Sequence, residues 1–156
     1  MSGETNVPGV ATRRLGLGWL LLSAAVATHV ADEALTGFLS VYNPTVLALR
    51  QSLGWWPMPT FTYEGWLSGL VAGIVILFAL SPLAFRNAQG FRPFAYLFAA
   101  LMIVNGAGHT VGTIAGRTFE FIRFSRPMPG FYSSPFLIAA SIYVLVELRR
   151  SALDSG

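Results

Sequence analysis

Cysteine and lysine are both absent from this chain of 156 residues, and charged residues of any kind are scarce. Without cysteine there can be no disulfide, no thiolate metal ligand and no cysteine nucleophile, so the chemistry must come from nitrogen and oxygen groups. Only 11% of the residues are charged and 54% are hydrophobic, whereas an ordinary soluble domain has roughly a quarter of its residues charged. This deficit of charge indicates a protein of the lipid bilayer.

All ten basic residues are arginine, and they lie singly or in pairs at the ends of hydrophobic segments. This distribution is typical of membrane anchoring and argues against nucleic-acid binding, despite the formal net charge of +3. If both termini are cytoplasmic, six arginines fall on the cytoplasmic side and four on the other. The positive-inside rule therefore predicts a multi-pass protein of the plasma (inner) membrane with cytoplasmic termini.

Four hydrophobic segments fit the chain, since a spanning helix needs about 20 apolar residues. We expect spans at residues 15–41, 63–85, 94–114 and 134–148. Pro44 should end the first span, because proline disfavours helix at the residue before it, and Ser134 with Pro135 should begin the last. The predicted fold is an all-α, integral membrane four-helix bundle. It forms a single domain between polar tails at residues 1–14 and 151–156.

Two further features concern the first span and the connection after it. Arg13 and Arg14, followed by a short apolar run that ends near Ala27, resemble a cleavable export signal. We favour an uncleaved span, because the helix-periodic hydrophobic pattern continues past Ala27 to Val41. The connection is expected to hold a short surface helix at 45–50 and to lie on the membrane.

Polar residues gather on one face of the first span. His29, Asp32, Glu33, Thr36 and Ser40 have the spacing i, i+3, i+4, i+7, i+11, which places them on one side of a helix. The opposite face is apolar and runs from Val30 through Ala31, Ala34 and Leu35 to Phe38. Ionisable residues inside a membrane are costly, face the protein interior and are functional-site hypotheses by default.

The third span repeats this pattern, with Asn105 and His109 at i, i+4. The first and third spans run in the same direction, and a rise of 1.5 Å per residue puts His29 and His109 within a few ångströms of the same depth. Glu64 begins the second span, which runs the other way, so it falls in the same leaflet. We therefore predict one intramembrane site in one leaflet.

Glycines recur every four residues at the same level, which is a spacing that lets membrane helices approach closely. They are Gly65, Gly69 and Gly73 on the second span and Gly108, Gly112 and Gly116 on the third. We expect these faces to pack helices together, and a homo-oligomer could form through them.

Two imidazoles with several carboxylates suit zinc, iron or manganese, and such a divalent metal would offset the buried negative charge. The alternative is a metal-free site, in which a protonated carboxyl acts as general acid or proton carrier and histidine orients it. Arg117, Arg123 or Arg126 could be its ion partners.

At these residues the sequence resembles the HXXEE domain family, small bacterial membrane proteins named for a His-x-x-Glu-Glu motif. Here the motif runs from His29 to Glu33, with Asp32 in place of the first glutamate. The family's Asn-x-x-x-His motif matches Asn105 to His109, and its Pro-Gly segment matches Pro129 and Gly130, followed by Phe-Tyr-Ser-Ser. The resemblance implies a membrane-bound, metal-dependent enzyme.

The leading hypothesis is a metal-dependent membrane hydrolase that acts on a lipidic substrate. Its metal ligands would be His29, Glu33 and His109; Asp32 or Glu64 would be the general base, and Asn105 would orient a ligand or the substrate.

Two other function classes stay open. One is a metal-free isomerase or cyclase of isoprenoid-like lipids, with Tyr63, Trp66 and Tyr132 as candidate aromatic groups that stabilise a carbocation. The other is a non-enzymatic role as a carrier or as a subunit of a membrane complex. Against a carrier stand the single-leaflet distribution of polar groups and the absence of an evident inverted repeat.

Overall fold

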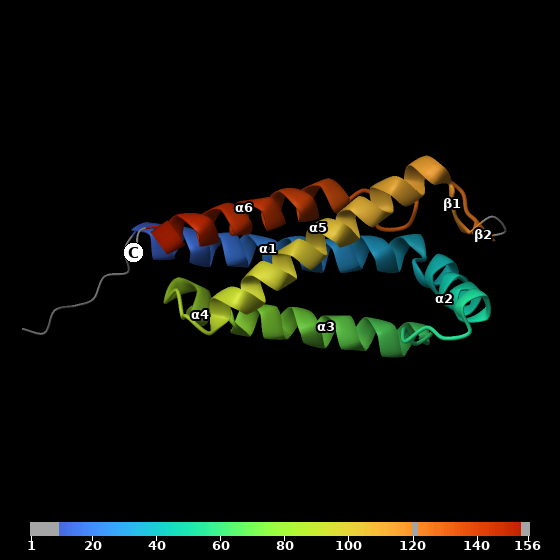
Figure 1. Cartoon of the computed structure of the whole chain (residues 1–156), viewed down its shortest axis with the longest axis horizontal. Helices are drawn as coiled ribbons and strands as arrows, with labels where there is room; N and C mark the ends of the chain where they lie inside the picture. The colour runs from blue at the N-terminus through green and yellow to red at the C-terminus, as the bar shows by residue number, and fades with distance from the viewer. Residues whose placement is uncertain (1–9, 120–121, 154–156) are drawn as a thin grey trace, which may run out of the picture.

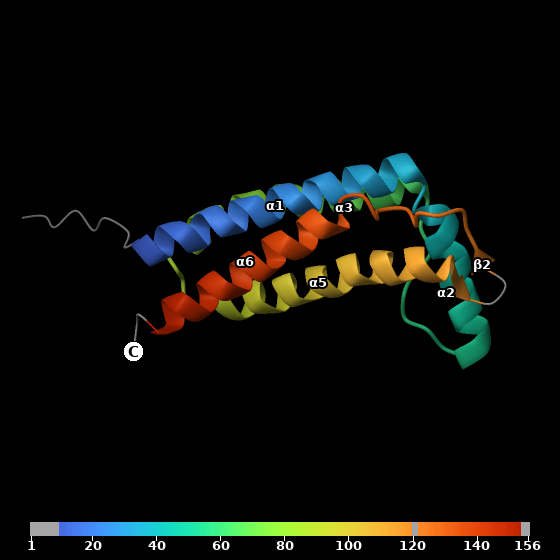
Figure 2. The same cartoon turned by 90° about the horizontal axis from the view of Figure 1, so that it is seen from above.

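The computed structural model describes residues 10–119 and 122–153, and almost all of this part is helical. The elements, in chain order, are α1 (Val10–Thr36), α2 (Leu39–Leu53), α3 (Tyr63–Ala79), α4 (Ser81–Phe85), α5 (Phe91–Ala115), β1 (Arg117–Phe119), β2 (Ile122–Arg123) and α6 (Ser134–Leu153). The long helices α1, α3, α5 and α6 run lengthwise, and α2 and the β1–β2 hairpin lie together at one end (Figure 1, Figure 2). The predicted tails lie partly outside the described residues, and their inner residues belong to α1 and α6.

Three helical segments are long and apolar enough to cross a membrane: Thr12–Thr36, Tyr63–Phe85 and Phe91–Ala115. Their bounds agree within a few residues with the second and third predicted spans and with the start of the first. The fourth predicted span corresponds to α6, whose 20 residues include Glu147, Arg149 and Arg150 near its end. Helix α6 is therefore long, but it is not among the three segments that are apolar enough to cross a membrane.

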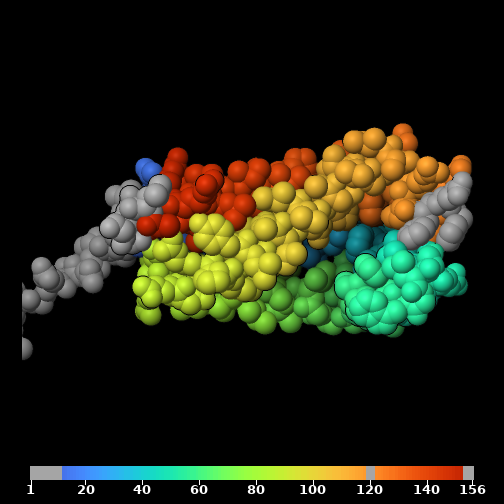
Figure 3. Space-filling model, in the orientation of Figure 1, coloured from blue at the N-terminus to red at the C-terminus, as the bar shows by residue number. Residues whose placement is uncertain are grey.

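The helices do not pack as four equivalent neighbours. Helix α1 contacts α3, α4 and α6, and α5 packs mainly on α6. A hollow separates α5 from α3 in the space-filling view, with α1 behind it (Figure 3). The β1–β2 hairpin, which the all-α prediction did not include, pairs Arg117 with Arg123 just beyond the end of α5.

The first helix ends earlier than predicted, at Thr36 rather than Val41. Gly37 has φ +78°, and the Phe38 N–H donates to the carbonyl of Glu33 at 3.0 Å. This is a Schellman C-cap, which needs a residue in the left-handed conformation and favours glycine there. The chain then turns into α2, so Pro44, which we expected to end the first span, lies inside the next helix. The predicted surface helix at 45–50 is part of α2.

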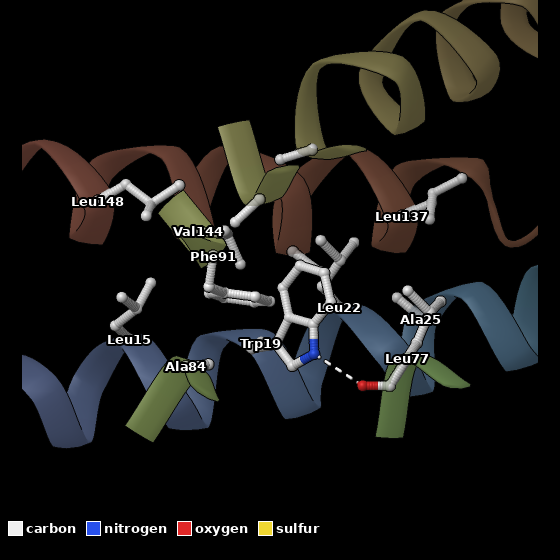
Figure 4. Packing of buried hydrophobic residues seen from close by; sticks show 13 residues of the cluster. Leu15, Trp19, Leu22, Ala25, Leu77, Ala84, Phe91, Leu137, Val144 and Leu148 are labelled. Atoms are coloured by element: carbon white, nitrogen blue, oxygen red, sulfur yellow. Dashed lines mark hydrogen bonds between the residues drawn. The ribbon is translucent and has the colours of Figure 1, made fainter. Parts of the chain in front are cut away.

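The hydrophobic core fills the half of the molecule at which α1 begins. It comprises Leu15, Trp19, Leu22, Ala25, Leu77, Ala84, Phe91, Ala95, Ala99, Leu137, Ala140, Val144 and Leu148. Trp19 is at its centre, with its ring 4.7 Å from that of Phe91 in an edge-to-face arrangement. The Trp19 indole N–H donates to the carbonyl of Leu77 at 2.8 Å (Figure 4). That carbonyl is in the last turn of α3, where helix carbonyls lack helical partners.

Only some of the predicted glycine contacts occur within the chain. A Cβ at Gly69, Gly73 or Gly108 would meet nothing within 4 Å, so these glycines pack against no other helix among the described residues. The close approach of α5 to α6 instead uses Gly106, where a Cβ would lie 2.7 Å from Ile138 Cγ1. The four-residue spacing places the glycines of each helix on one face, but it does not show whether that face packs against a neighbouring helix. A homo-oligomer through the open glycine faces stays a prediction.

Candidate metal centre

His29 and Glu33, one turn apart on α1, meet His109 of α5 beyond the core. The three residues are buried, with exposed fractions of 3%, 5% and 4%. One ligand atom from each can be chosen so that all three lie within 4.8 Å of one another. The two histidines therefore lie close together, as we expected, and their common depth in a membrane stays a prediction.

The two imidazoles converge on one carboxylate oxygen. Glu33 Oε1 lies 3.5 Å from His29 Nε2 and 3.2 Å from His109 Nε2. Two ligands bound at 2.0–2.1 Å to a tetrahedral ion are about 3.3 Å apart. Both N–O separations are close to this value and the three ligand atoms lie within 4.8 Å of one another, so the group could hold a divalent ion.

Ser133 connects His29 to Asp32. Ser133 Oγ lies 2.8 Å from His29 Nδ1 and 2.8 Å from Asp32 Oδ2, and the Ser133 backbone N–H also donates to Asp32 Oδ2 at 2.8 Å. A serine has a single hydroxyl proton, and the carboxylate is the stronger acceptor. We therefore assign that proton to Asp32 and the His29 proton to Nδ1, which donates to Ser133. This tautomer leaves the Nε2 lone pair directed at the cluster.

The segment 126–130 runs antiparallel to the end of α5 and closes the site from one side. Gly130 has φ +84°, and a Cβ there would lie 2.8 Å from His109 Cε1 and 2.9 Å from Glu33 Cγ. Its N–H donates to Thr36 Oγ1 at 3.2 Å. Further along, Met128 covers Gly112. A glycine is required at position 130 because of both the backbone conformation and the close approach.

For two side chains at the cluster, Asn105 and His109, no hydrogen bond fixes which polar atom donates and which accepts. Asn105 Oδ1 lies 3.1 Å from His29 Nε2, and this amide would donate to Nε2 if its oxygen and nitrogen were exchanged. His109 Nδ1 is buried and has no hydrogen-bond partner in the described part of the chain. An orphaned ring nitrogen at a cluster of this kind is consistent with a site built for a further ligand or water.

An apolar groove of about 500 Å³ opens beside the cluster. It is lined by Phe38, Leu101, Met102, Val104, Asn105, Gly108, His109 and Met128. The Phe38 ring lies 5.6 Å from that of His109, although we placed Phe38 on the face opposite the polar residues. The helical-face argument failed because α1 ends at Thr36, before Phe38. Ser40, predicted on the polar face, is likewise beyond this break and exposed. Gly37 is the residue in the sequence that could have indicated the end of α1 at this point.

Other predicted site residues lie elsewhere. Glu64 is exposed in the first turn of α3, and no described hydrogen bond or ion pair joins it to the cluster. Tyr63 and Tyr132 are 49% and 69% exposed, whereas Trp66 is buried with its ring 6.0 Å from that of Phe38. The arginines that could have been ion partners, Arg117, Arg123 and Arg126, line a separate cavity at the end of α5.

No protein-family model, curated protein or solved structure matches this chain.

Proposed function

We propose that this chain is an integral membrane, metal-dependent enzyme that hydrolyses a lipidic substrate. The observation that carries the proposal is the buried cluster in which two imidazole nitrogens converge on Glu33 Oε1. Three buried polar groups on two apolar helices are costly unless they are used. His29, Glu33 and His109 would hold a divalent zinc, iron or manganese ion.

The bound ion would supply a Lewis acid and an activated water at its open position. Asp32 and Ser133 would act as positioning residues, because they fix the proton of His29 on Nδ1 and so present Nε2 to the ion. Of the two predicted general bases, Asp32 is nearer to the cluster, because its carboxylate accepts from Ser133, the partner of His29, whereas Glu64 is exposed at the start of α3. The Asn105 amide, which lines both cluster and groove, would orient the substrate.

The setting supports a lipidic substrate. The groove beside His109 is lined mainly by apolar residues of α5, one of the three helices that can cross a membrane. We extend the proposal to a four-span bundle in which α6 is the fourth span, with cytoplasmic termini and the site in the outer leaflet. Membership of the HXXEE domain family, on the motifs described above, is part of the same proposal.

A second candidate is the metal-free isomerase or cyclase of isoprenoid-like lipids. It is favoured by the aromatic rings of Phe38 and Trp66, of which Phe38 lies next to His109. Aromatic faces stabilise carbocations. In that version the carboxyl of Glu33, held between the imidazoles, would be the acid.

The two candidates are separated by metal dependence and by product. The purified protein, loaded with zinc, iron or manganese and placed in vesicles of phospholipid and acylglycerol, should release free fatty acid or headgroup, detected by mass spectrometry. The same preparation should be inactive after chelation and should recover when the metal is returned. Isomerised lipid formed by chelated protein would support the second candidate, and no metal-dependent cleavage of any lipid would contradict the first.

A further inference from the structure

A second cavity, of about 350 Å³, lies where α5 ends and the β1–β2 hairpin begins. It is lined by Ala115, Gly116, Arg117, Arg123, Phe124 and Arg126. Three of its side chains are guanidinium groups, which present fork-shaped sets of donors that match the oxygens of a phosphate. We call this cavity the arginine pocket.

The charge in the arginine pocket is not balanced by the chain as described. Over residues 10–119 and 122–153, no carboxylate lies within salt-bridge distance of Arg117, Arg123 or Arg126. The end of α5 offers some compensation, because a helix C-terminus has a partial negative charge of about half a unit. That is too little for three guanidinium groups, so among residues 10–119 and 122–153 the pocket has an excess of positive charge.

The arginine pocket is connected to the metal centre by the segment 126–130. Arg126 packs over Gly116, where a Cβ would lie 2.8 Å from its Nε, and Gly130 packs against His109. Gly116, the C-cap of α5, is seven residues after His109, or about 10 Å along the helix axis. Because one short segment holds both ends, the pocket and the cluster have a fixed separation.

The groove lies beside the cluster, and most of its lining is on the side away from the arginine pocket. Its α5 residues run from Leu101 to His109, whereas the arginine pocket begins at Ala115. Met128 lines the groove and covers Gly112, between the two cavities. Along α5 the order is therefore an apolar groove, the His/Glu cluster and a cationic pocket. A lipid has the same order, with an apolar chain, a linkage and a phosphate.

We propose that the arginine pocket binds the phosphate group of a lipid whose apolar chain lies in the groove beside His109. Resting on the proposed function, this makes a phosphate-bearing lipid the substrate class of the enzyme. Basic pockets between membrane helices are known to bind anionic lipid headgroups. Arginines that only anchored the protein at the membrane surface would not need to line one cavity or to lie at a fixed distance from the cluster.

The test measures binding by native mass spectrometry in a phosphate-free detergent, with protein stripped of metal by chelation. The probes are dioleoyl phosphatidate and dioleoylglycerol, which differ by the phosphate, and inorganic phosphate serves as competitor. The variant is R117Q/R123Q/R126Q. Its matched control is R13Q/R14Q/R86Q, which removes the same charge from exposed arginines elsewhere.

We expect wild type and the control to bind phosphatidate at least about tenfold more tightly than dioleoylglycerol. The pocket variant should lose this preference, and inorganic phosphate should compete. The proposal would be overturned if both triple variants lost the preference for phosphatidate equally, or if the pocket variant kept it. Arginine-dependent binding of inorganic phosphate without a preference for phosphatidate would overturn the lipid part. Because the protein is metal-free, failure here leaves the metal-dependent hydrolysis standing, and failure of hydrolysis leaves this result standing.

Discussion

His29 and Ser133, which are 104 residues apart, are joined by a hydrogen bond of 2.8 Å between Nδ1 and Oγ. Through Ser133 the ring is linked to the carboxylate of Asp32. Metal-binding histidines characteristically donate their other ring N–H to a carboxylate, a carbonyl or water, which fixes the tautomer. The Pro-Gly-Phe-Tyr-Ser-Ser segment is therefore part of the site because it delivers this serine.

Ser133→Ala should weaken metal binding, because His29 would lose the acceptor that holds its proton on Nδ1. We expect about a 10- to 100-fold rise in the metal dissociation constant, measured by competition with a chelator. The matched control is Ser134→Ala, since the Ser134 hydroxyl donates to the carbonyl of Gly130 rather than to the cluster. Equal affinities in the two variants would mean that Ser133 does not act through His29.

Gly130→Ala should destabilise the protein more than Gly54→Ala. Both glycines have positive φ, but a Cβ at Gly54 would meet nothing within 4 Å, whereas one at Gly130 would meet His109 and Glu33. We expect a loss of about 1 kcal/mol at position 54 and more than about 2 kcal/mol at position 130, measured by unfolding in detergent. Similar losses of stability in the two variants would show that Gly130 does not pack on the cluster.

Gly106→Ala should also be destabilising, by about 1–3 kcal/mol, because the added methyl would overpack the contact of α5 with Ile138. Gly108→Ala, two residues further along the same helix and open to its surroundings, should be neutral or stabilising by up to about 1 kcal/mol. The thermal unfolding midpoints of the two variants, compared with wild type, check this. The reverse order would mean that Gly108 has the closer neighbour.

Trp19→Phe should cost about 1–3 kcal/mol, because the Leu77 carbonyl would stay buried without its donor. Trp55→Phe should change stability by less than about 0.5 kcal/mol, since Trp55 is 72% exposed. Neither should alter metal binding, because the core lies apart from the cluster. A larger loss for Trp55 than for Trp19 would contradict the assignment of the core.

The sequence predicted the second and third long apolar helices and the convergence of His29, Glu33 and His109. Both follow from local rules, since hydrophobic length marks a span and helical periodicity places residues on a face. The rise per residue and the common direction of the first and third spans predicted that the two histidines lie close together.

Features that depend on tertiary contacts were not predicted. The Schellman cap at Gly37 ends α1 and brings Phe38 close to His109. We had placed the helix end next to Pro44, because proline is the more familiar helix terminator. The contacts of Gly106, Gly112 and Gly116 depend on which segment lies opposite each one. Residue spacing alone does not show which segment packs against which. For the same reason, the sequence identified Ser133 only as part of a motif and did not predict its hydrogen bond to His29.

Elemental analysis of the purified protein tests the central claim most directly. Wild type should contain about one zinc, iron or manganese ion per chain, and the double variant His29→Ala plus His109→Ala should contain none while keeping its helical circular dichroism. Glu64→Gln, which changes an acid outside the cluster, should retain the ion. Wild type without stoichiometric metal, or a double variant that keeps it, would contradict a metal centre formed by His29, Glu33 and His109.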